Sequence, residues 1–113
     1  MSEYTPDSWQ VFRVKTTEET FYKVLAGWSG SYLHGDSWRV NSGIHHIEVK
    51  GDYYHFVGDS GSVYKCHKDG EQMRNSIAYV WNQMKDQYGD LVELCTVQDV
   101  LREPTIEDTY IKE

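Results

Sequence analysis

Five histidines hold the most versatile chemistry in this chain, because a neutral imidazole can bind a metal ion or accept a proton. His46 and Glu48 alternate with apolar neighbours on one expected strand, and His55 on the next strand could reach the same face. Three such ligands could hold zinc, but no pair has the close spacing of a zinc motif. We therefore expect half-exposed strand histidines and no metal or other cofactor. The five are His34, His45, His46, His55 and His67.

Acid–base catalysis would need a titrating group beside its substrate, and His55 next to Asp36 or Asp59 would supply one. Any small domain offers such a pair. The chain contains no nucleophile elbow, phosphate-cradling glycine loop or His-Glu-x-x-His motif. We therefore expect a non-enzymatic protein and keep a small histidine–aspartate or metal-dependent hydrolase as an alternative.

Aromatic residues make up 14% of the chain, with nine Tyr, four Trp and three Phe. One helix cannot cover so many rings, and exposed Tyr and Trp are favoured anchors of protein interfaces. We expect an aromatic surface on the strands and turns that binds a protein partner. An alternative is a site that stacks a nucleotide-like ligand and uses Arg39, Lys65 and His55. The expected binding residues are Trp28, Tyr32, Trp38, Tyr53, His55 and Tyr64.

Negative charge is concentrated in the last quarter of the chain. The whole chain has a net charge of −7, and residues 86–113 carry eight acids against two bases. No cluster of Lys and Arg exists to neutralise phosphates, so we expect no direct binding of nucleic acid. The acidic quarter either steers a partner or is a solvated tail. The steering candidates are Asp99, Glu103, Glu107 and Asp108.

Short runs of alternating residues separated by turn residues predict an antiparallel meander between residues 38 and 67. Residues 9–15 and 91–95 read as further strands. Residues 21–28 favour a strand, although a short helix stays open there. The period then changes, and residues 71–88 carry one apolar helical stripe that ends at Gly89. The stripe consists of Met73, Ile77, Val80, Trp81, Met84 and Tyr88.

The expected fold is therefore α+β: a single domain with a twisted antiparallel sheet of five or six strands, packed by one amphipathic helix. We place a polar leader at residues 1–8, the domain at 9–103 and an acidic tail at 104–113. Within the domain, Thr96 can cap a short helix over residues 97–102, with Asp99 as the third residue after it.

The two cysteines, Cys66 and Cys95, lie in apolar, strand-like contexts and read as buried, reduced residues. No export signal precedes them, and no apolar run approaches the roughly 18 residues of a membrane span. These features predict a cytoplasmic protein without a membrane partner. A homodimer is compatible with each function considered above.

Two short segments resemble small accessory proteins of large T-even-like tailed phages: residues 38–44 (WRVNSGI) and residues 60–68 (SGSVYKCHK). The resemblance covers about residues 28–70. It implies an early, non-structural phage protein that binds and inhibits or modulates a host or defence protein in the host cell cytoplasm. It transfers no functional residue to this chain.

Overall fold

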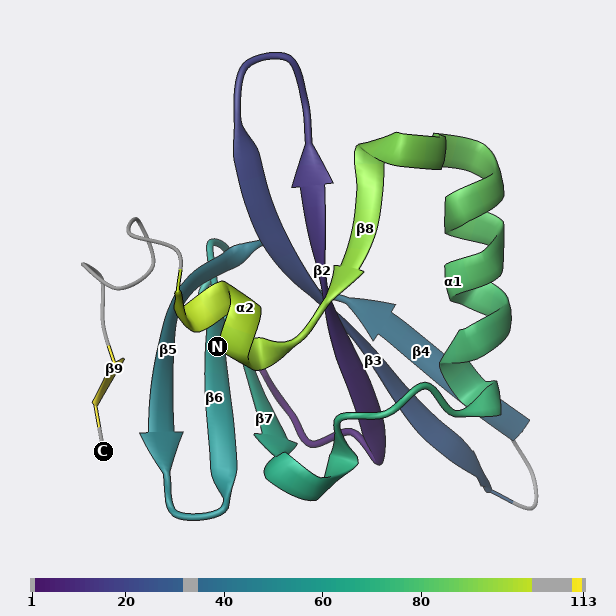
Figure 1. The fold of residues 1–113 in the computed structure, drawn as a ribbon. Coiled ribbons are helices and arrows are strands. Elements are labelled where there is room, and N and C mark those ends of the chain that lie inside the picture. The colour runs from purple at the N-terminus through teal and green to yellow at the C-terminus, as the bar shows by residue number, and fades with distance from the viewer. Residues whose placement is uncertain (1, 32–34, 103–110, 113) are drawn as a thin grey trace.

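The computed structural model describes residues 2–31, 35–102 and 111–112, and its elements form three layers (Figure 1). The outer sheet has the strand order β1-β7-β6-β5-β9, and the central sheet has the order β4-β3-β2-β8. The helix α1 covers the far side of the central sheet. The outer sheet contains β1 (Glu3–Tyr4), β5 (Ile44–Lys50), β6 (Tyr53–Gly58), β7 (Val63–His67) and β9 (Ile111–Lys112). The central sheet contains β2 (Ser8–Lys15), β3 (Thr20–Ser31), β4 (Gly35–Val40) and β8 (Val92–Cys95).

The α+β class is confirmed, but the strands divide between two sheets where one was predicted. The reason lies in β2 and β3, which are apolar on both faces. Val24 and Leu25 are adjacent on β3, so they point to opposite faces, and both are fully buried. A strand that is buried on both faces must lie in a middle layer. The predicted strand at residues 21–28 is confirmed as part of β3.

Between the two sheets lies a core built around Trp9, which is 0% exposed. Its ring meets Phe56 edge-on, with the ring centroids 5.4 Å apart. Its indole Nε1 donates a hydrogen bond to the carbonyl oxygen of His67 at 2.8 Å. The one polar atom of this ring therefore has a hydrogen-bond partner at the end of β7, where β2 of the central sheet approaches the outer sheet.

The helix α1 (Asn75–Tyr88) packs Ile77, Val80 and Trp81 against the other face of the central sheet. It begins four residues later than the predicted residue 71. Glu71 and Gln72 instead run beside β2, where the Gln72 amide donates to the Trp9 carbonyl oxygen at 3.1 Å. The apolar stripe predicted the packing of the helix correctly, and tertiary contacts moved its start.

Both ends of the described chain add a short strand to the outer sheet. β1 pairs in parallel with β7, and β9 pairs in parallel with β5. Residues 3–4 and 111–112 therefore belong to the sheet, whereas the sequence predicted a leader and a tail there. The two short strands cover the edges of the outer sheet, which reduces the exposed row of unpaired backbone groups.

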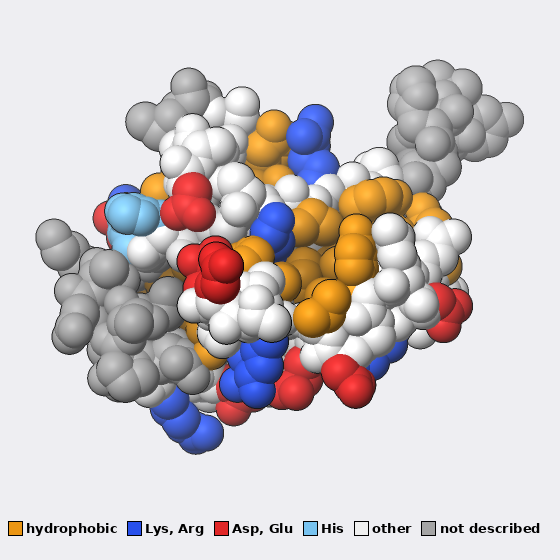
Figure 2. Space-filling view, turned by 90° about the horizontal axis from the view of Figure 1, so that it is seen from above, with side chains coloured by type: hydrophobic (Ala, Val, Ile, Leu, Met, Phe, Trp, Pro, Cys, Tyr) orange, Lys and Arg blue, Asp and Glu red, His pale blue; other side chains and the backbone are white. Residues whose placement is uncertain are grey.

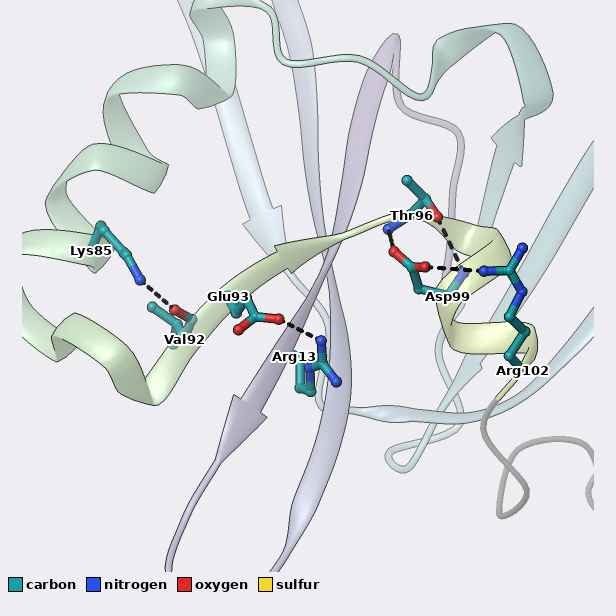
Figure 3. Close-up of polar contacts among 7 residues, drawn as sticks. All are labelled: Arg13, Lys85, Val92, Glu93, Thr96, Asp99 and Arg102. Carbon is teal, nitrogen blue, oxygen red and sulfur yellow. Dashed lines mark hydrogen bonds and ion pairs between the residues drawn. The ribbon is translucent and has the colours of Figure 1, made fainter.

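The short helix α2 (Val97–Leu101) begins with the expected cap. Thr96 Oγ1 accepts a hydrogen bond from the Asp99 amide at 3.1 Å, and Asp99 Oδ2 accepts one from the Thr96 amide at 3.0 Å (Figure 3). Together they form a reciprocal capping box. None of the described helices is long and apolar enough to cross a membrane.

Candidate binding groove

The expected aromatic residues do not gather on one surface. Trp38 is 45% exposed on β4, and Tyr53 is exposed on the outer sheet. Trp28 is half-buried, and its Nε1 donates to the Thr5 carbonyl oxygen at 3.0 Å. Tyr64 is only 3% exposed within the core, so its expected place on a binding surface is wrong. Tyr32, Glu103, Glu107 and Asp108 lie outside the described residues.

Tyr53 and His55 lie on the solvent side of the outer sheet. This side carries a network of charged and polar side chains rather than an aromatic surface. Glu48, His55 and Lys65 are cross-strand partners, and the Lys65 amine lies 2.6 Å from a carboxylate oxygen of Glu3. Partial burial, followed by the neighbouring charges of Lys50 and Lys65, lowers the pKa of His55 from its ordinary value of 6.5. Within this network, Lys65 pairs with Glu3, and Lys50 pairs with Glu48.

Of the two pairs considered for acid–base catalysis, His55–Asp59 is not formed, and the side chain of Asp36 lies outside what the structure describes. Asp59 lies beside His45, with Oδ1 and Nδ1 3.7 Å apart, and both side chains are mostly exposed. The expected partner, His55, instead faces Glu48. Within residues 2–31, 35–102 and 111–112, no group of three or more His, Cys, Asp or Glu side chains could hold a metal ion.

Both cysteines are buried and free of disulfide bonds, as the sequence predicted. Burial raises the pKa of the Cys66 thiol well above its usual value, and that of Cys95 to about 12. Both sulfurs are therefore protonated at neutral pH, whereas nucleophilic attack requires a thiolate. Neither cysteine is a candidate nucleophile.

The three residues expected to hold a nucleotide-like ligand are divided between two places. His55 and Lys65 lie on the solvent side of the outer sheet. Arg39 borders a hollow of about 620 Å³, where its guanidinium carbon lies 4.5 Å from the centroid of the Tyr4 ring. We call this the Arg39 hollow. It is lined by Glu3, Tyr4, Thr5, Trp28, Ser37, Trp38 and Arg39.

A more apolar groove of about 570 Å³ opens between the β2–β3 hairpin, β4 and the C-terminal half of α1. Figure 2 looks onto this end of the molecule and shows hydrophobic side chains gathered there. Large apolar patches exposed on a protein surface commonly mark interaction sites. We call this the apolar groove. Its apolar lining is Phe12, Val14, Phe21, Trp38, Val40, Val80, Met84, Tyr88, Leu91 and Val92.

Three half-exposed side chains form the rim of the apolar groove. Trp38 and Tyr88 are each 45% exposed, and Leu91 is 51% exposed. Trp38 is on β4, Tyr88 ends α1 and Leu91 ends the 3-10 turn η2 (Gly89–Leu91). Three separate elements thus present large apolar side chains to solvent around one concavity, where a partner could bury them together.

A lysine fixes the turn that carries Leu91. Lys85 Nζ donates to the Gly89 carbonyl oxygen at 3.0 Å. It also donates to the Val92 carbonyl oxygen at 2.8 Å (Figure 3). Gly89 has a φ of +57°, a conformation that favours glycine. The expected helix stop at Gly89 therefore also positions one rim residue of the groove.

The polar residues of the apolar groove include two cations from the hairpin, Lys15 and Lys23. Neither amine forms an ion pair with a carboxylate in the part of the chain that the structure describes. The helix contributes the neutral amides of Gln83 and Gln87. The groove is thus apolar at its centre, with positive charge at the hairpin side of an otherwise acidic protein.

Sequence reasoning found one rim residue, Trp38, and assigned the other two to packing. Tyr88 continued the helical stripe, and Leu91 read as the start of a strand. The available signal was their position: both flank Gly89, where the helix ends and the chain turns back toward β8 of the central sheet. Searches of protein-family models, of curated proteins and of solved structures each found no match to this chain.

Proposed function

We propose that this protein is a non-enzymatic binding protein that takes a protein partner at the apolar groove. The observation that carries the proposal is the rim, where Trp38, Tyr88 and Leu91 stay half-exposed around one concavity. Each of them belongs to an element of secondary structure, so fixing its backbone on binding would cost little conformational entropy. Burying such rings and aliphatic groups at the centre of an interface supplies most of the binding energy in many complexes.

The phage resemblance extends the proposal to the kind of partner. A small, acidic protein of this type would inhibit or modulate a host or defence protein in the host cytoplasm. Asp99, one of the expected steering residues, is half-exposed and bound within the capping box of α2. Any electrostatic steering would therefore rest mainly on the other acids of the last quarter of the chain.

Native mass spectrometry of tagged protein captured gently from a bacterial extract tests the proposal. The experiment compares the wild type with Leu91→Ser in the groove and with Tyr79→Ser. Tyr79 is a matched control because it is 48% exposed on α1 but does not line the groove. We expect a co-captured protein at fixed stoichiometry with the wild type and Tyr79→Ser, and its loss with Leu91→Ser. Equal capture by all three proteins would contradict the proposal.

A second candidate function is the sequestration of a planar anionic ligand, such as a nucleotide, in the Arg39 hollow. The stack of Arg39 on Tyr4, beside the indole of Trp28, favours it. A guanidinium can pair with a phosphate, and the rings offer stacking surfaces. A panel of nucleotides should then raise the melting temperature of the wild type, but not of Arg39→Gln. The absence of any shift across the panel would remove this candidate.

A further inference from the structure

The strand β4 forms one edge of the central sheet, and its outward backbone groups can be identified from the hydrogen bonds at its end. The Asn41 amide donates to the Val24 carbonyl oxygen at 3.1 Å, and the Val24 amide donates to Asn41 Oδ1 at 2.8 Å. Hydrogen-bonded positions alternate along an antiparallel pair. Arg39 therefore bonds to its partner on β3, whereas the N–H and C=O groups of Trp38 and Val40 point away from the sheet.

Within the described residues, no strand pairs with β4 on that side. The side chains of β4 alternate between two concavities. Trp38 and Val40 line the apolar groove on the α1 side, and Ser37 and Arg39 line the Arg39 hollow on the other side. Trp38 borders both. The edge thus combines unpaired backbone groups with a recess on each side of the sheet, the arrangement that strand addition uses.

We propose that the partner binds as an extended strand that adds to the free edge of β4. The inference rests on the proposed function and specifies the form of its ligand. An added strand places alternate side chains on opposite faces. One set would enter the apolar groove beside Trp38 and Val40, and the other set would enter the Arg39 hollow. The ligand is therefore a segment with large apolar residues at every second position and an acidic residue between them.

The positive charge of Arg39, which has no ion-pair partner in the described part of the chain, is the reason to expect an acidic residue in the added strand. Among the described residues that line the Arg39 hollow, Glu3 is the one carboxylate, and it is paired with Lys65 at 2.6 Å. Among the described residues, Arg39 has a ring contact with Tyr4 but forms no ion pair. A carboxylate from the added strand would supply the missing partner, and Arg–carboxylate pairs are among the stronger hydrogen-bonded contacts.

A second copy of this chain fits the edge less well. A symmetric antiparallel pairing places residues with outward backbone groups opposite one another, so Arg39 would face Gly35, Ser37 or Arg39 of the other copy. None of these is a carboxylate. Each copy also carries a net charge of −7, and the two charges repel. A different protein with an apolar–acidic strand is therefore the preferred occupant.

A random library of 12-residue peptides displayed against the full chain tests the inference. We expect enriched peptides with apolar residues at a period of two and an acidic residue among them. Peptides with apolar residues at a period of three or four would indicate a helical ligand and would overturn strand addition. Failure to enrich any peptide, or a protein that only dimerises through β4, would overturn it as well.

The backbone of Val40 gives the matched variants. Val40→Pro removes the outward N–H and leaves the β3–β4 hydrogen bonds in place, whereas Val40→Ala changes only the side chain. Both variants lose the valine side chain that lines the groove, but only the proline lacks the N–H. We therefore expect Val40→Pro to weaken the binding of a selected peptide about tenfold more than Val40→Ala does. Equal effects would contradict the inference. Should Val40→Pro not fold, N-methylation of alternate peptide amides decides the question: one set should abolish binding and the other should not.

This test separates the inference from the proposed function. If Val40→Pro still captures a protein from the extract and Leu91→Ser does not, the groove binds a partner without strand addition. The inference then fails and the proposed function stands. If Leu91→Ser captures the protein as well as the wild type does, the proposed function itself fails.

Discussion

Trp38 stands where the edge of the central sheet, the apolar groove and the Arg39 hollow meet. A ring that is 45% exposed contributes little to the core and has much area to lose on binding. We expect Trp38→Ala to weaken capture of the partner by about 2 kcal/mol, as for an interface hot spot. The free energy of unfolding should change much less. A similar loss of binding in Tyr79→Ala would show that the effect is not specific to the groove.

His55 gives a prediction about pH. Its pKa in the folded protein is lowered, first by burial and then by Lys50 and Lys65, so folding favours the neutral ring. The stability that this preference contributes is complete above the ordinary value of 6.5 and is lost as the pH falls through the lowered value. Urea unfolding between pH 7.5 and pH 5 should therefore show a smaller loss of stability for His55→Gln than for the wild type. If the stability of the two proteins fell equally with pH, the loss would not come from His55 and the prediction would be wrong.

At the scale of elements, α1 approaches the central sheet closely at Gly27. A Cβ atom there would lie 2.5 Å from Ile77 Cγ2 and 2.7 Å from Ser76 Oγ, both on buried residues of the helix. We expect Gly27→Ala to push the helix away and lower the free energy of unfolding by about 1–3 kcal/mol. Ser37→Ala, on the exposed part of β4, is the control and should change it by less than about 0.5 kcal/mol. A neutral Gly27→Ala would mean that the helix packs more loosely.

The turn η2 should depend on Lys85. Lys85→Met keeps a long apolar side chain but removes both hydrogen bonds to the carbonyl oxygens of Gly89 and Val92. We expect a loss of about 1 kcal/mol and faster hydrogen exchange at Leu91 and Val92, because the turn is no longer held. Weaker capture of the partner should accompany it. Lys50→Met, on the outer sheet, is the control, and unchanged exchange in Lys85→Met would contradict the role.

Local patterns in the sequence predicted most elements because each pattern is decided by near neighbours. The capping box of Thr96 and Asp99, the stop at Gly89 and the alternation of β5 and β6 all act within a few residues. The start of α1 was missed because its first predicted turn is held beside β2 by contacts with Trp9. Tertiary contacts that outweigh local preference leave no signal in the local sequence.

At the scale of the whole molecule, the division into two sheets determined which rings are exposed. Tyr53 on β6 and Tyr64 on β7 both belong to strands of the outer sheet whose residues alternate between its two faces. Tyr64 is nevertheless buried in the core, whereas Tyr53 faces solvent. Alternation predicts that neighbouring residues face opposite sides but does not predict which side a second sheet covers. In the sequence, the adjacent apolar residues Val24 and Leu25 were the available sign of a strand covered on both faces, and the structure buries both.

The groove could not be predicted from the sequence because it joins the hairpin, β4 and the end of α1, which are distant in the chain. Sequence reasoning could find an excess of aromatic residues over what one helix can cover. It could not identify which of these aromatic residues line a groove on the folded protein. Of its candidate residues, only Trp38 lines the apolar groove within the described chain.

Site-specific photo-crosslinking in bacterial cells tests the central claim most directly. A photoreactive phenylalanine analogue would replace Tyr88 in the groove, Tyr79 on the exposed side of α1 or Tyr53 on the outer sheet, since all three are comparably exposed. We expect one discrete crosslinked protein from position 88 and none from positions 79 and 53. A crosslink from position 53 alone would place the interface on the outer sheet, and its presence at all three positions would indicate nonspecific contact; either result would contradict the groove as the binding site.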